Sequence, residues 1–90
     1  MPERRSTFTL TFARSARREL GALDAPVSRR ILSKIESLLL EPRPTGCLKL
    51  TGSSNLWRLR VGDWRVIYSI DDAAKAVDVI AIRHRSDAYR

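Results

Sequence analysis

The clearest structural signal in the chain is the stretch Leu56-Trp-Arg-Leu-Arg-Val-Gly-Asp-Trp-Arg-Val-Ile-Tyr-Ser-Ile70. Residues 56–61 and 64–70 alternate apolar and polar side chains, as strands do when only one face is buried. Gly62 and Asp63 lie between them and suit a two-residue hairpin turn of type II′, because glycine tolerates the positive φ of the first turn position. The stretch therefore predicts an antiparallel β-hairpin.

Pairing the two strands across this turn sorts their side chains onto two faces. The apolar face collects Trp57, Leu59, Val61, Trp64, Val66 and Tyr68. The other face collects Arg58, Arg60 and Arg65, with Arg60 directly opposite Arg65. Like charges directly opposite each other destabilise a sheet by about 0.2–1 kcal/mol per pair. This face therefore indicates an anion site, the alternative being a solvated face on which the arginines extend apart.

The flanking sequence predicts two helices and three further strands. The expected strands are 7–12, 47–50 and 76–83, and the expected helices run from Ala13 to about Leu23 and from about Pro26 to Leu40. The elements follow the order strand, helix, helix, four strands. We therefore expect a single α+β domain over residues 1–90, with an antiparallel helical hairpin packed on one face of a mostly antiparallel sheet.

The last strand decides whether a fourth arginine joins the arginine face. A five-residue loop over Asp71–Lys75 would pair Ile70 with Ala76 and Val66 with Ile80. This register puts Arg83 on the same face as the other arginines. A slip of one residue would move Arg83 to the opposite face, because side chains alternate along a strand.

The charge of the chain favours a polyanionic partner. Seventeen basic and ten acidic residues give a net charge of +7 and a pI near 10.8, and fourteen of the basic residues are arginine. The planar guanidinium binds phosphate oxygens two at a time, which favours nucleic acid over a membrane surface. A basic surface that serves only solubility is the alternative.

Other function classes find little support in the sequence. The single cysteine, Cys47, cannot form an internal disulfide, sits in an apolar strand and is expected to pack in the core. No cysteine–histidine spacing predicts a metal site, no acidic pair suits general acid–base catalysis, and no cofactor is expected. No apolar run approaches the roughly 18–20 residues of a membrane span or forms a signal peptide, so a cytoplasmic protein is expected.

The C-terminal residues 83–90 combine cations with a histidine and a tyrosine. His84, Arg85, Tyr89 and Arg90 lie in this segment. A tyrosine beside arginines can stack on a base while the arginines hold the phosphates. The alternatives are an ordinary disordered terminus and, for the lone histidine, no direct role.

Several segments, taken in their order along the chain, together resemble the RelE toxins of the RelE/ParE superfamily. They are residues 8–10, 13, 16–20, 49–52, 57–68 and 84–90, which cover nearly the whole chain. The resemblance implies the RelE-like microbial ribonuclease-type fold. It also implies a metal-independent, ribosome-dependent endoribonuclease that cuts mRNA in the A site. Its partners would be mRNA, the ribosome and a RelB-like antitoxin that silences the toxin in a hetero-oligomer.

The resemblance assigns roles by position. In this family chemistry the RNA 2′-hydroxyl attacks the adjacent phosphodiester and leaves a 2′,3′-cyclic phosphate and a 5′-hydroxyl. The implied catalytic residues are Arg58, Arg60, Arg65, Arg83 and Tyr89, with Arg65 as the phosphate-binding arginine and Arg83 as the proposed general acid. The residues expected to bind RNA are Lys49, His84, Arg85 and Arg90.

One departure from the family pattern bears on the mechanism. Some members have lysines at the positions of Arg58 and Arg60, and one of those lysines is a proposed general base. Arginine does not deprotonate in proteins, so Arg60 is expected to stabilise the phosphate instead. The 2′-hydroxyl proton would then leave to His84, to water or to a ribosomal RNA group.

Two other functions are compatible with the same sequence. A ParE-like toxin would use this fold to inhibit DNA gyrase by protein–protein contact, without cutting RNA. A plain nucleic-acid-binding module, or a toxin that binds ribosomes without cleaving, would show salt-sensitive RNA binding alone. The combination of Arg58, Arg60, Arg65, Arg83 and Tyr89 favours the nuclease.

Overall fold

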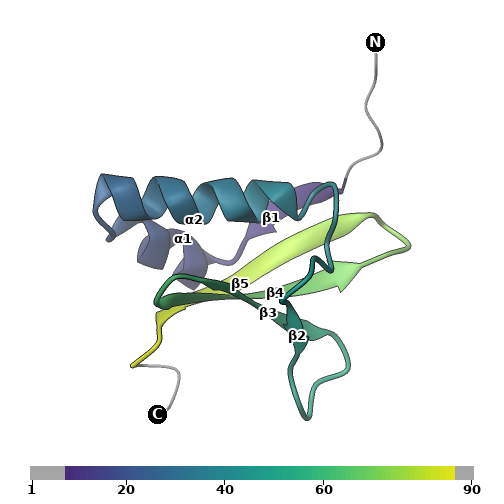
Figure 1. Cartoon of the computed structure of the whole chain (residues 1–90). Helices are drawn as coiled ribbons and strands as arrows, with labels where there is room; N and C mark the ends of the chain where they lie inside the picture. Colours follow the sequence, from purple (N-terminus) through teal and green to yellow (C-terminus); the bar gives the residue numbers. More distant parts are fainter. Residues whose placement is uncertain (1–7, 87–90) are drawn as a thin grey trace.

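The computed structural model describes residues 8–86, which form two helices and a five-stranded sheet (Figure 1). The helices are α1 (Arg14–Gly21) and α2 (Ala25–Ser37). The strands are β1 (Thr9–Phe12), β2 (Leu48–Lys49), β3 (Leu56–Val61), β4 (Trp64–Asp71) and β5 (Ala76–His84). No helix in this part of the chain is long and apolar enough to cross a membrane.

The strands lie in the order β1-β5-β4-β3-β2, with β1 parallel to β5 and every other pair antiparallel. Figure 1 shows α1 and α2 together on one side of this sheet. The expected α+β fold, a helical hairpin on one face of a mostly antiparallel sheet, is therefore confirmed. The side of the sheet away from the helices is the open face.

The core lies between the helices and the sheet. Its fully buried side chains of largest volume are Tyr68, Ile31, Ile35, Leu38, Val66, Val77 and Val79. Tyr68 is polar at one end, and its hydroxyl donates a 2.7 Å hydrogen bond to the carbonyl of Pro42. Burial raises the pKa of Tyr68 far above its ordinary value, so this hydroxyl stays a donor. Cys47 packs against the same cluster, as expected.

The predicted β3–β4 register is confirmed at every position. Arg60 pairs with Arg65, and Trp57 pairs with Tyr68. Gly62 has a φ of 61°, and Asp63 has no positive φ, which is the type II′ pattern. A Cβ at Gly62 would also lie 2.6 Å from Nη2 of Arg30, so the flexible end of that side chain would have to move.

The predicted β4–β5 register is wrong, but its consequence for Arg83 is right. Ile70 pairs with Val77 instead of Ala76, and Val66 pairs with Ile82 instead of Ile80. The strand β4 continues to Asp71, so the loop is shorter than the predicted Asp71–Lys75. The carboxylate of Asp71 closes this loop by accepting a 3.0 Å hydrogen bond from the amide of Ala74. A bulge between Ile67 and Tyr68 then shifts the register by one more residue. Two shifts of one residue restore the original face.

The ends of several elements also differ from the prediction. The helix α1 is shorter than 13–23, the strand β2 is shorter than 47–50, and β1 begins at Thr9. The helix α2 ends at Ser37 instead of Leu40, because the next three amides bond to carbonyls three residues back. This tightening precedes Pro42, which cannot continue a helix.

Leu38 and Leu40 give a matched test of the core. Leu38 is fully buried, whereas Leu40 is 68% exposed only two residues later. We expect Leu38→Ala to lower the free energy of unfolding by about 2–5 kcal/mol, because it leaves a cavity under the helices. Leu40→Ala should change it by no more than about 0.5 kcal/mol. Urea denaturation measures both, and equal losses would contradict this packing.

Candidate functional site

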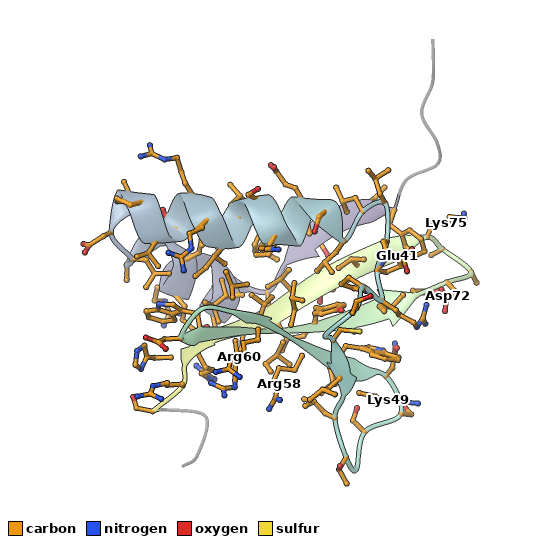
Figure 2. The ribbon with its side chains drawn as sticks, in the orientation of Figure 1. Glu41, Lys49, Arg58, Arg60, Asp72 and Lys75 are labelled. Carbon is orange, nitrogen blue, oxygen red and sulfur yellow. The ribbon has the colours of Figure 1, made fainter. Side chains whose placement is uncertain are left out.

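Three arginines stand side by side across the centre of the open face. Arg65 on β4 is directly opposite Arg60 on β3 and directly opposite Arg83 on β5. We call these three residues the arginine row. Arg58 lies two residues before Arg60 on β3, so it shares the same face. Figure 2 shows Arg58 and Arg60 on the side of the sheet away from the helices.

The arginine row is graded in exposure. Arg65 in the middle is only 6% exposed, whereas the side chain of Arg83 is 47% exposed and Arg60 is exposed. Facing residues of an antiparallel pair have Cβ atoms roughly 4.5–5.5 Å apart, so each outer cation repels the central one. The row concentrates positive charge over a partly dehydrated centre, where an anion is attracted more strongly than in water.

An ion pair holds one end of the arginine row. Nη1 of Arg83 donates to Oε2 of Glu19 on α1. The other carboxylate oxygen of Glu19 accepts a 2.8 Å hydrogen bond from the backbone amide of Ile82. Sequence reasoning missed Glu19. Its four-residue spacing from Ser15 is an ordinary helical pattern, and only the fold brings it to β5.

Lys49, expected to bind RNA, is not on the arginine face. It pairs with Trp57, so its side chain is on the face of the apolar residues. Nζ of Lys49 lies 5.9 Å from the centroid of the Trp57 ring, and the guanidinium of Arg43 lies 5.0 Å from the same centroid. Arg43 also binds Asp72, and its hydrogen bonds hold the pKa of that carboxyl below the ordinary value.

His84 also faces away from the arginines. It is directly opposite Trp64, and the two rings meet edge to face with centroids 4.9 Å apart. Nδ1 of His84 lies 3.0 Å from the hydroxyl of Ser86. The structure therefore separates His84 from the arginine row by the thickness of the sheet.

The remaining predicted residues lie near the chain end. The backbone amide of Arg85 donates to the carbonyl of Asp63, and Nε of Arg85 lies 3.8 Å from the Asp63 carboxylate. Arg85 is thus held beside the β3–β4 turn, next to the arginine row. Tyr89 and Arg90 lie outside the described residues.

The chemistry of the arginine row suits the binding of phosphate groups. Residues 8–86 enclose no pocket, and they hold no group of three His, Cys, Asp or Glu side chains arranged for a metal. Guanidinium groups bind phosphate oxygens in pairs and keep their charge at all ordinary pH values. The row can therefore bind a phosphate and stabilise added negative charge, but it cannot accept a proton.

Comparisons with known proteins agree on one superfamily. The family model described as the ParE toxin of the type II toxin–antitoxin system parDE matches residues 10–89. Toxin RelG of Mycobacterium tuberculosis is 29% identical over 84 residues, which cover 92% of this chain and 97% of that protein.

Solved structures of RelE toxins share the fold. In the archaeal RelE–RelB complex from Pyrococcus horikoshii, the matching chain gives a TM-score of 0.79 at 29% identity, covering 89% of this chain and 97% of that one. The isolated E. coli RelE toxin gives 0.77 at 26% identity, covering 91% and 90%.

The like charges of the arginine row predict that Arg60 lowers the free energy of unfolding. We expect Arg60→Gln to raise the free energy of unfolding by about 0.2–1 kcal/mol at low salt, because it removes a cation opposite Arg65. The gain should shrink in 1 M NaCl, where the screening length falls to about 3 Å. Urea denaturation at both salt concentrations measures this. Arg29→Gln, an exposed change on α2, is the control, and a loss of stability in Arg60→Gln alone would contradict the prediction.

Proposed function

We propose that this chain, which belongs to the family of ParE toxins of type II toxin–antitoxin systems, arrests growth by cleaving mRNA on the ribosome. The observation that carries the proposal is the arginine row, with Arg65 held between Arg60 and Arg83 on an open face. Such a surface can receive an extended RNA strand. The similarity to RelG and to RelE structures also supports the proposal of mRNA cleavage.

In the proposed reaction, the 2′-hydroxyl of one nucleotide attacks the phosphodiester that follows it. The bond to the 5′-oxygen of the next nucleotide breaks, and this oxygen takes up a proton from water or from a group of the ribosome. The products are a 2′,3′-cyclic phosphate and a free 5′-hydroxyl. Negative charge develops on the phosphate oxygens as the new bond forms. Arg65, with Arg60 and Arg83 beside it, would stabilise this charge in place of a metal ion.

The proton of the 2′-hydroxyl needs an acceptor outside the arginine row. Arg60 keeps its proton, and His84 is on the other face against Trp64, so both are poor candidates. In this proposal the proton leaves to water or to a group of the ribosome. The ribosome would also hold the mRNA in a geometry ready for attack, which explains why cleavage would depend on it.

An antitoxin partner follows from the same family. The related Pyrococcus horikoshii toxin was solved in complex with RelB. We propose that a RelB-like protein binds this chain and silences it in a hetero-oligomer. An acidic segment of that partner would compete with RNA for the arginine face.

Inhibition of DNA gyrase is the second candidate. The matching family model carries the name of ParE, and the fold is common to both kinds of toxin. In that case the arginine face would be a surface for protein contact.

Growth arrest gives the test of the proposed site. Expression of the chain alone in a bacterial host should cause codon-phased cuts in translated mRNA, seen by primer extension. We expect Arg65→Ala to slow cleavage by about 10²–10³-fold, because it removes the central cation from the developing charge. Arg83→Ala should also relieve arrest, and Arg29→Ala on α2 should not.

A gyrase supercoiling assay on the same variants separates the two candidates. Intact mRNA with inhibited supercoiling would contradict the nuclease and favour gyrase. If Arg65→Ala and Arg83→Ala both remain fully toxic, the arginine face is the wrong site. Circular dichroism should be unchanged in both variants.

A further inference from the structure

The strand β5 is longer than its neighbour β1, which leaves part of its edge uncovered by a strand. The last pair between them joins Phe12 to Val79, and β5 continues to His84. Beyond this pair, backbone groups along the edge of β5 need other partners.

The segment that leads into α1, and α1 itself, supply those partners. The amide of Ala13 donates to the carbonyl of Val79, and the hydroxyl of Ser15 donates to the carbonyl of Ile80 at 3.3 Å. Glu19, one helical turn after Ser15, accepts from the amide of Ile82 at 2.8 Å. The carboxylate of Glu19 is therefore fixed against rigid backbone and is only partly exposed, at 26%.

This fixed carboxylate also holds Arg83. One oxygen binds the backbone of β5, and the other accepts from Nη1 of Arg83. A guanidinium has five N–H donors, so this bond leaves donors of Arg83 available to a second anion. The side chain of Arg83 is 47% exposed, so a second anion can still reach it.

Without Glu19, the side chain of Arg83 would be repelled by Arg65. It is directly opposite Arg65, and repulsion between like charges favours an extended, mobile Arg83 side chain. The charge of Glu19 offsets this repulsion and fixes a long side chain in one place before any ligand arrives. Prior fixing of a binding group lowers the entropic cost of the productive geometry.

We propose that Glu19 is a positioning residue that fixes the Arg83 guanidinium beside Arg65, so that both cations bind the same phosphate. Its effect on cleavage rests on the proposed function above, whereas its effect on Arg83 in the free protein does not. Glu19 itself would not touch the RNA.

Cleavage kinetics give the first test. Glu19→Gln keeps an oxygen for the amide of Ile82 but removes the charge that holds Arg83. With ribosomes programmed with mRNA, we expect kcat to fall by about 10–100-fold with no rise in KM, because RNA still binds a more cationic protein. Glu36→Gln, the same change at an exposed position of α2, should leave both unchanged.

A double-mutant cycle separates positioning from mere support of the fold. In the Arg83→Ala background, Glu19→Gln should have no further effect on kcat, since there is no guanidinium left to position. An equal fall in both backgrounds would overturn the proposal, because it would mean that Glu19 acts through the edge of β5 alone. A wild-type kcat in Glu19→Gln would overturn it as well.

Side-chain dynamics in the free full-length chain test the same claim without any RNA or activity. In ¹⁵N relaxation, the Nε–H of Arg83 should be rigid in the wild-type protein, and that of exposed Arg29 should be mobile. Glu19→Gln should make Arg83 as mobile as Arg29. If Arg83 is already mobile in the wild type, the proposal fails even if Glu19→Gln does not fold. An inactive wild-type protein with a rigid Arg83 would instead refute the proposed nuclease and uphold the positioning.

Discussion

Repulsion within the arginine row is the constraint around which the sheet is organised. Arg60, Arg65 and Arg83 face one another across three adjacent strands, and the central one is almost fully buried. Each of the two facing pairs costs stability. The ion pair of Arg83 with Glu19 offsets part of this repulsion, and the opposite face of the same strands adds stabilising free energy. It does so with buried aliphatic and aromatic side chains under α1 and α2.

The alternation of side chains along β3 and β4 keeps the charged arginines and the apolar core residues on opposite faces of the sheet. Arg58, Arg60 and Arg65 point to the open face, and their neighbours Leu59 and Val66 point to the core. A fold of this small size has no room for a deep cleft, so its concentrated charge lies on a flat surface. In the proposed function, this surface receives an RNA strand presented by the ribosome.

Short-range turn chemistry explains which parts of the site could be predicted from the sequence. The Gly62–Asp63 turn fixes the β3–β4 register, so the pairing of Arg60 with Arg65 followed directly. The β4–β5 register depends on the length of its loop and on a bulge, neither of which has a clear sequence signal. Arg83 was predicted on the correct face only because two shifts cancelled.

The positions of Lys49, His84 and Glu19 have a related explanation. His84 directly follows Arg83, and Lys49 pairs with Trp57, the neighbour of Arg58. A change of one residue reverses the face of a strand, so both side chains lie on the face away from the arginines. Glu19 contacts Arg83 because β5 extends beyond the end of β1. The helix α1 then covers the part of the β5 edge that β1 leaves unpaired. That arrangement joins residues more than sixty positions apart, and no local pattern encodes it.

A structure of the toxin on a ribosome would show directly whether mRNA binds the arginine row. The A-site mRNA would carry a 2′-O-methyl group at the scissile position, so that the 2′-oxygen cannot attack. We expect one phosphate within hydrogen-bond distance of Arg65, flanked by Arg60 and Arg83. An mRNA that passes over another surface, with the arginine row facing solvent or protein, would contradict it.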